Sequence, residues 1–239
     1  MNLILLGASE IGALLPIGDR RVAHIVRVLR KGPGDELLAG LLVEEACGSS
    51  PCSIGRARIQ SLDERGLVLT YRPERMAPTL HRLRIVLGFP RPIQASRLLK
   101  ELTSLGIAEL LFTGTELGEK SYLESDFWKK GEYRQALIEG AEQAANPRLP
   151  RVTRTWTLER ALLQMDEESW RGGSRIFLHP GGGHPRLGAI EATAPATIAV
   201  GSERGWTARE LALLEHADGE GAAARHGVGL ASHDRRVAA

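Results

Sequence analysis

Residues 200–210 read Val-Gly-Ser-Glu-Arg-Gly-Trp-Thr-Ala-Arg-Glu, and they join the end of an apolar run to the start of a helix. Thr207 is expected to cap that helix, with Glu210 reaching back from the third helical position and Trp206 packing on Leu211. The glycines of the loop permit a left-handed backbone or the close approach of a ligand. Many turns between a strand and a helix have this form without binding anything, so the loop predicts a helix start and raises the hypothesis of a binding site.

A second glycine-rich loop follows another apolar run, at Leu178-His-Pro-Gly-Gly-Gly183. Ligands of open α/β sheets bind outside the carboxyl ends of the strands, so the two loops together indicate a narrow cleft. Neither loop has the Gly-Lys-Ser/Thr or Gly-x-Gly-x-x-Gly pattern that holds phosphates, and a nucleoside-like cofactor without phosphates fits better than ATP or NAD. His179 is either a catalytic base or a packing and hydrogen-bonding residue of the strand end.

The chain divides into two parts of different pattern. Up to residue 76, short β-like runs at 37–43, 54–59 and 67–71 alternate with turn signals and predict a small β-barrel. Beyond it, strands alternate with helices, which predicts an α/β domain with a parallel sheet over residues 77–239. Its strands are expected at 83–89, 109–113, 175–178 and 197–200, and its helices at 93–105, 132–145, 158–170 and 208–217.

Composition is that of a soluble globular protein, with 239 residues, 43% hydrophobic and 25% charged. The apolar runs are far shorter than the roughly 20 residues that cross a bilayer, and the first residues do not resemble a secretion signal. These features predict a cytoplasmic protein. The two cysteines, Cys47 and Cys52, lie in a Gly/Ser/Pro-rich stretch with no nearby histidine pair, so no metal site is expected.

Basic residues gather between Arg20 and Lys31. Asp19 is a candidate N-cap, and Val22, Ile25, Val26 and Leu29 follow helical spacing as a buried stripe. Arg20, His24, Arg27 and Lys31 then share the opposite face, which predicts either a phosphate-binding ridge or an ordinary solvated helix face.

Several short motifs, in this order and spacing, resemble those of one known family. They are His24-Ile-Val-Arg-Val-Leu-Arg-Lys-Gly-Pro-Gly-Asp35, Arg91-Pro, Lys120-Ser-Tyr, Glu139-Gly-Ala-Glu-Gln-Ala144 with Arg148-Leu-Pro, and Gly201-Ser-Glu-Arg-Gly-Trp206. The chain resembles the RsmE-type 16S rRNA (uracil-N3)-methyltransferases of the SPOUT superfamily. The resemblance implies a PUA-like β-barrel that holds RNA, a SPOUT α/β domain with a trefoil knot, S-adenosyl-L-methionine (SAM) as cofactor, a homodimer, and the small ribosomal subunit as partner.

The resemblance also carries residue roles. It places the cofactor at Leu178, His179, Gly181, Gly201, Ser202, Glu203, Arg204, Gly205, Trp206, Gly227 and Leu230. It places RNA contacts at His24, Arg27, Arg30, Lys120, Glu142, Gln143 and Arg148, although Glu142 and Gln143 equally fit solvated helix positions. No residue is assigned as catalytic, and no metal is required.

One departure from the family pattern lies at the end of the chain. The third cofactor loop is expected at His226-Gly-Val-Gly-Leu-Ala-Ser-His-Asp-Arg-Arg-Val237, where only Gly227, Asp234 and Leu230 keep the pattern, and residues 218–225 lack the apolar strand expected before it. The divergent tail is compatible with either a complete or an incomplete trefoil knot. The alternative hypothesis is a catalytically impaired homologue that binds RNA or the ribosome. A third hypothesis is a protein that binds another adenosine-like ligand without methyl transfer.

Overall fold

The computed structural model describes residues 3–42, 52–165, 170–179, 187–216 and 224–229. The chain forms two compact units, each built from separate stretches of sequence. Unit 1 comprises residues 1–80, 99–106 and 134–149, and unit 2 comprises residues 81–98, 107–133 and 150–239. No helix among the described stretches is long and apolar enough to cross a membrane.

Unit 1 is built on a five-stranded mixed sheet with the order β1-β3-β4-β5-β2. The strands are β1 (Ile4–Gly7), β2 (Leu14–Pro16), β3 (Glu36–Leu42), β4 (Ser53–Asp63) and β5 (Gly66–Met76). Strand β1 runs parallel to β3, and the other neighbours are antiparallel. The sequence predicted the β-rich character of this region and three of these strands. The structure shows a five-stranded mixed sheet here, and the PUA-like barrel stays a prediction.

The sheet of unit 1 is apolar on both faces, because successive residues of a strand point to opposite sides. Ile4 and Leu6 belong to one buried cluster together with Val22 and Ile25 of the segment after β2. Leu3 and Leu5 belong to a second cluster, which includes Ala141 and is flanked by Ile138, Ala145 and Leu149. Helix α5 (Tyr133–Ala144) therefore completes the core of unit 1.

Unit 2 contains a six-stranded parallel sheet with the order β11-β9-β10-β6-β7-β8. Its strands are β6 (His81–Gly88), β7 (Ile107–Thr113), β8 (Arg151–Thr155), β9 (Ser174–His179), β10 (Ala196–Val200) and β11 (Ala224–Gly229). The predicted parallel sheet is confirmed. The sequence missed β8, and it also missed β11, which pairs with β9 along its whole length and includes residues 226–229 of the segment expected to be the third cofactor loop.

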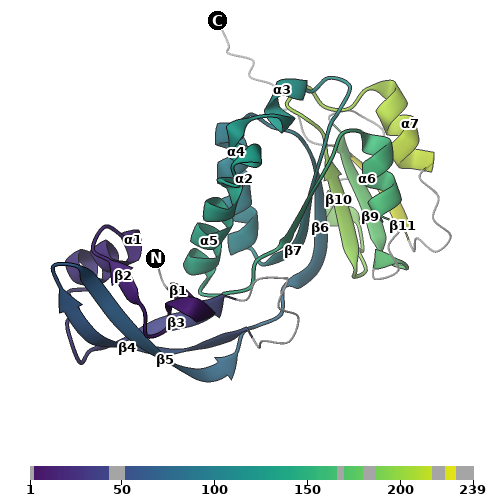
Figure 1. The fold of residues 1–239 in the computed structure, drawn as a ribbon. Coiled ribbons are helices and arrows are strands. Elements are labelled where there is room, and N and C mark those ends of the chain that lie inside the picture. Colours follow the sequence, from purple (N-terminus) through teal and green to yellow (C-terminus); the bar gives the residue numbers. More distant parts are fainter. Residues whose placement is uncertain (1–2, 43–51, 166–169, 180–186, 217–223, 230–239) are drawn as a thin grey trace, which may run out of the picture. The chain divides into compact units, whose positions relative to one another are not determined.

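Helices flank this sheet (Figure 1). They are α2 (Pro92–Ser104), which begins in unit 2, and α3 (Lys120–Leu123), α4 (Asp126–Lys129), α6 (Leu158–Met165) and α7 (Ala208–His216). Helices α6 and α7 share a buried cluster with Val86, Leu111 and Ala199 of the sheet. The helix predicted at 158–170 ends at Met165, and residues 166–169 lie outside the described part of the chain.

Three charged side chains lie next to one another on the neighbouring strands β6, β7 and β8. Glu109 of β7 accepts hydrogen bonds from Arg84 of β6 at 2.9 Å and from Arg151 of β8 at 2.9 Å. The Arg84 guanidinium also lies 4.3 Å from the ring centroid of Trp170. A buried carboxylate is tolerated where it is paired and hydrogen-bonded in this way, and the trio fixes the register of three adjacent strands.

Candidate functional site

The carboxyl ends of three strands lie side by side in unit 2. Leu178 of β9 pairs with Val200 of β10 and with Val228 of β11, so the segments after these strands leave the same edge of the sheet. His179 ends β9, and its Nδ1 is buried without a hydrogen-bond partner among the described residues. The structure therefore brings together the ends of the two strands that precede the loops singled out in the sequence, and residues 180–183 of the first loop lie outside the described part of the chain. Gly181, a predicted cofactor residue, lies outside the described residues.

The loop after β10 is a tight turn. Gly205 donates its N–H to the Ser202 carbonyl at 2.8 Å and has a left-handed φ of +76°. A Cβ on Gly201 would lie 2.8 Å from the Gly205 carbonyl carbon. Gly201 is therefore required by the turn's own packing, and a bulky residue there would distort the turn before it met a ligand.

The turn is also pressed against the neighbouring strand. A Cβ on Gly88, the last residue of β6, would lie 2.4 Å from the Ser202 nitrogen. Glu203 accepts a long hydrogen bond of 3.4 Å from the Arg91 N–H, and the Arg204 side chain is exposed. The predicted cofactor residues 201–206 thus form one compact loop beside the ends of β6 and β9.

Helix α7 begins as the sequence predicted. Thr207 donates its N–H to Glu210 Oε2 at 2.9 Å, and Glu210 donates its N–H to Thr207 Oγ1 at 3.2 Å. Trp206 is 5% exposed and packs in the cluster that includes Leu211. Its ring Nε1 is buried and has no partner within the described ranges. The capping box and the hydrophobic staple are confirmed.

Glu116, in the segment after β7, contacts the start of α7, and the sequence did not predict this contact. Its N–H donates to Glu210 Oε1 at 2.8 Å, and its own carboxylate accepts from the Thr207 hydroxyl and from Arg209, both at 2.6 Å. These hydrogen bonds lower the pKa of Glu116 below its usual value, with the Thr207 hydroxyl as the largest cause. Arg209 also binds Glu159 of α6 at 2.5 Å. The segment after β7 and the starts of α6 and α7 are therefore tied together.

The third predicted loop is only partly described. Gly227 lies within β11 and pairs with Phe177 of β9, so it belongs to a strand and not to a loop. Leu230 and Asp234 lie outside the described residues, as does most of the segment expected to complete the knot. The knot remains a prediction.

The predicted basic ridge of unit 1 is only partly formed. Asp19 caps α1 (Arg20–Ala23) by accepting the Arg21 N–H at 2.8 Å, as expected. The chain then continues as a π-helical turn, η2 (His24–Val28), in which Leu29 donates its N–H to the His24 carbonyl.

This wider turn changes which side chains face outward. Val26 and Leu29 are 36% and 39% exposed, so their assignment to the buried stripe is wrong. Arg27 and Arg30 are exposed, and neither forms an ion pair in the part of the chain that is described. His24 is partly buried, and Lys31 lies 4.0 Å from Asp35.

Glu142 of α5 is neither solvated nor available to a ligand. It is 2% exposed and accepts two hydrogen bonds from Arg20, at 2.8 and 2.9 Å. The neighbouring Gln143 is exposed. Arg148 donates Nε to the Ala77 carbonyl at 3.4 Å, and Lys120 is exposed at the start of α3 in unit 2. The predicted RNA contacts thus include exposed side chains and one closed ion pair.

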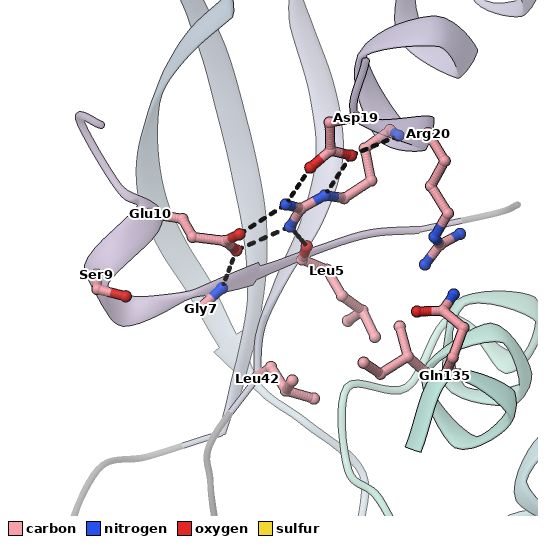
Figure 2. Close-up of a pocket in the computed structure, with 10 residues that line it drawn as sticks. Leu5, Gly7, Ser9, Glu10, Asp19, Arg20, Leu42 and Gln135 are labelled. Atoms are coloured by element: carbon pink, nitrogen blue, oxygen red, sulfur yellow. Dashed lines mark hydrogen bonds and ion pairs between the residues drawn. The ribbon is translucent and has the colours of Figure 1, made fainter. Parts of the chain in front are cut away.

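A pocket of about 610 Å³ opens beside this pair in unit 1 (Figure 2). Arg20 and Gln135 line one part of it, while Arg21 is held by Glu10 at 2.6 Å and by Asp19 at 2.7 Å. The Arg21 guanidinium is the main cause that lowers the pKa of both carboxyl groups. Because the guanidinium of Arg21 is already paired with two carboxylates, this network stabilises the wall of the pocket and leaves Arg21 unavailable to a ligand.

In the described ranges, no group of three or more His, Cys, Asp and Glu side chains is placed to hold a metal ion. Cys52 is a buried thiol that donates to the Leu41 carbonyl at 3.5 Å, and Cys47 lies outside those ranges.

Comparison with known proteins gives the family. A family model described as an RNA methyltransferase domain matches residues 77–222. The chain is 34% identical over 224 residues to ribosomal RNA small subunit methyltransferase E of Treponema pallidum, covering 90% of this chain and 80% of that protein. It is 31% identical to ribosomal RNA small subunit methyltransferase E 1 of Borreliella burgdorferi, covering 90% of this chain and 85% of that protein.

Solved structures agree on the fold. The crystal structure of a ribosomal RNA small subunit methyltransferase E from Neisseria gonorrhoeae, bound to S-adenosyl methionine, superposes with a TM-score of 0.68 at 18% identity. The match covers 95% of this chain and 89% of that one. Given the matched family model and the two sequence relatives, the chain belongs to the ribosomal RNA small subunit methyltransferase E family.

Proposed function

We propose that the protein is a SAM-dependent methyltransferase that acts on N3 of a uridine in 16S rRNA of the small ribosomal subunit. The observation that carries this proposal is the shared edge of β9, β10 and β11, at which the tight turn 202–205 and the capped start of α7 directly follow β10. That edge is where ligands of parallel α/β sheets bind. The family relatives are named as small-subunit rRNA methyltransferases.

The residues at this edge fit SAM. Two buried ring nitrogens, His179 Nδ1 and Trp206 Nε1, lack partners among the described side chains, and a bound ligand would satisfy such groups. The turn at Ser202–Gly205 offers backbone groups without the pattern that holds phosphates, as a nucleoside with an amino-acid tail requires. We assign the cofactor to Leu178, His179 and residues 201–206, with Gly181, Gly227 and Leu230 retained from the sequence.

When bound, SAM supplies an electrophilic methyl group on a sulfonium, and uracil N3 takes this methyl as the N3 proton leaves and neutral S-adenosylhomocysteine remains. The protein's own task is to hold the base with N3 in line with the methyl group. The base must first be unstacked, since its Watson–Crick edge is otherwise closed. Positioned cations or amide donors would favour the anionic form of the base by electrostatic stabilisation.

RNA contacts are proposed for the exposed side chains of the predicted set. Arg27, Arg30, Lys120 and Gln143 are exposed, and His24 and Arg148 are partly exposed. Glu142 is assigned instead to holding Arg20, because its carboxylate is buried and doubly bonded. Cationic side chains of this kind bind the phosphate backbone and orient the RNA.

The proposal includes a homodimer that works in the cytoplasm, where ribosomes assemble. The family resemblance of the sequence supports the dimer, and sedimentation of the purified protein measures its mass directly. The alternative, an RNA- or ribosome-binding homologue that has lost SAM affinity, is favoured by the divergent sequence of residues 218–239.

The decisive experiment is a calorimetric titration of the full chain with SAM, followed by methyl transfer to small subunits that lack the modification. Saturable SAM binding and N3-methyluridine in the digested rRNA are expected. A folded protein that binds the subunit but takes up no SAM would instead establish the non-enzymatic alternative. Transfer of the methyl group to a different atom would overturn the assignment to uracil N3.

A further inference from the structure

A second pocket, in unit 2, lies at the carboxyl end of the edge strand β8. It has a volume of about 510 Å³, and the residues that line it include Lys129 of α4, Thr153 and Arg154 of β8, Trp156 directly after β8, and Gln164 of α6. In the order of the sheet, β6 and β7 separate β8 from β10. At the usual strand spacing this is roughly 15 Å. The pocket is therefore distinct from the proposed cofactor site but opens at the same edge of the sheet.

Trp156 is unusual because its ring is left in water. It directly precedes Thr157, whose hydroxyl and carbonyl accept the N–H groups of Arg160 and Ala161 at the start of α6. Trp206 occupies the same position before the cap of α7, yet Trp206 is 5% exposed and Trp156 is 55% exposed. Two tryptophans at equivalent points of two βα units thus differ in burial. The staple that buries Trp206 has no counterpart at Trp156, where the residue one turn into the helix is the small Ala161.

The backbone that carries Trp156 is fixed. Gly114 donates its N–H to the Thr155 carbonyl at 3.0 Å, and a Cβ on Gly114 would lie 2.1 Å from the Trp156 carbonyl oxygen. The segment after β7 is therefore packed directly on Trp156. An exposed indole on a fixed backbone is preorganised for stacking, because little conformational freedom is lost when a ligand binds.

Cations accompany the exposed ring. The Arg154 guanidinium lies 5.5 Å from the ring centroid of Trp128 and 6.0 Å from that of Tyr133, so aromatic side chains support it. Lys129 adds a second positive charge to the pocket, against one carboxylate from Glu124. Thr153 Oγ1 is buried and has no hydrogen-bond partner among the residues described. An aromatic ring, a guanidinium plane, a basic edge and an unused hydroxyl are the groups that bind an unpaired nucleotide.

We propose that this pocket is a stacking subsite for an unpaired nucleobase of the RNA, with Trp156 as the stacking platform and Arg154 and Lys129 facing the adjoining phosphates. The proposal rests on the proposed function, since it assigns a second contact for the same RNA. The bound base is a neighbour of the methylated uridine along the strand. The subsite holds the unstacked conformation that the target base requires.

The test compares Trp156→Ala and Trp156→Phe with a matched control, Leu163→Ala. Leu163 lies on α6, is 75% exposed and does not line the pocket. For each variant, the KM for the RNA substrate, kcat, the Kd for SAM and the melting temperature are measured. Quenching of tryptophan fluorescence by a short single-stranded RNA is recorded in parallel.

Trp156→Ala is expected to raise the KM for RNA about tenfold or more, as the loss of one base stack predicts. Its Kd for SAM and its melting temperature stay near those of the wild type. Trp156→Phe restores most of the RNA affinity but loses the quenching. A KM for Trp156→Ala within twofold of wild type, or an equal loss in Leu163→Ala, overturns the subsite while leaving SAM binding and methylation intact. Failure of the proposed function itself is recognised separately, because the wild type then shows no methyl transfer.

Discussion

The ion pair between Arg20 and Glu142 shows how a single residue can change its apparent role. In the sequence, Glu142 lies in a motif that suggests contact with RNA. In the structure its carboxylate is buried and bonded at both oxygens, while the Arg20 side chain keeps 38% of its surface in water. A carboxylate in this setting stabilises unit 1 first, and any effect of its loss on RNA binding follows from that.

Glu142→Gln should lower the free energy of unfolding by about 1–3 kcal/mol, because Arg20 loses the negative charge of its partner and one of the two acceptors becomes a donor. The loss stays below the value for a fully buried pair, since Arg20 can turn to water. Urea denaturation measures it. Glu132 provides the control because it is exposed just before α5, and Glu132→Gln should change stability by less than about 0.5 kcal/mol. Equal effects of the two changes would contradict the structural role of Glu142.

At the scale of elements, the start of α7 is bonded to the segment after β7, which is distant in sequence. Glu210 satisfies the Thr207 N–H within its own helix and the Glu116 N–H from the segment after β7. A carboxylate accepts both bonds, whereas an amide has a single oxygen acceptor. The cap therefore positions the segment after β7 and the turn 202–205 at the same time.

Glu210→Gln should reduce the free energy of unfolding by about 1–2 kcal/mol, in the range of a lost helix cap. We also expect weaker SAM binding in calorimetry, because the turn beside the proposed cofactor site loses its anchor. Glu119→Gln is the matched control, since Glu119 precedes α3 and makes no side-chain cap. If the two variants have the same stability and the same Kd for SAM, Glu210 has no positioning role.

Elements with strong local signals could be predicted from the sequence, and those that depend on distant partners could not. The cap at Thr207 and the parallel sheet follow from residues close together in the chain. The polar strand β11 and the short strand β8 lack a hydrophobic pattern typical of strands. Their conformation depends on pairing with β9 and β7, which are distant in sequence. The π-helical turn of η2 likewise breaks the 3.6-residue spacing on which the buried stripe depended.

The candidate site follows the same division. Glycine loops and the capped helix mark residues 201–206 in the sequence. The bond from Glu116 to Glu210 and the pair of Arg20 with Glu142 join residues 94 and 122 positions apart, so no local pattern contains them.

At the scale of the whole molecule, both units contain carboxylates that accept hydrogen bonds from arginine. Arg21 lowers the pKa of Glu10 and Asp19 in unit 1, and hydrogen bonds from Thr207 and Arg209 lower that of Glu116 in unit 2. The ordinary values are 4.5 for Glu and 3.8 for Asp. Because the folded pKa is lower than the unfolded one, the folded protein binds fewer protons in this range. The resulting stability is complete above the unfolded pKa and is lost as the pH falls towards the folded pKa.

Glu10→Gln tests this linkage. At pH 7 the variant should be less stable than the wild type in urea denaturation, because a charged pair with Arg21 is lost. The difference should shrink as the pH falls below about 4.5, where the wild-type carboxylate is itself protonated on unfolding. Glu64→Gln, at the turn between β4 and β5, is the control and should keep a constant small difference. A gap between wild type and Glu10→Gln that is independent of pH would refute the linkage.

The discontinuity of unit 1 also has a consequence for the order of synthesis. The apolar side chains of Leu3, Leu5 and Ile54 are made early, yet the helix that covers them, α5, ends near residue 144. On a translating ribosome that adds about 5–20 residues per second, several seconds pass between the last residue of β5 and the arrival of that helix. During this interval the sheet of unit 1 has one finished face and one bare face. The nascent chain must therefore pass through a half-covered stage, which residues 134–149 bring to an end.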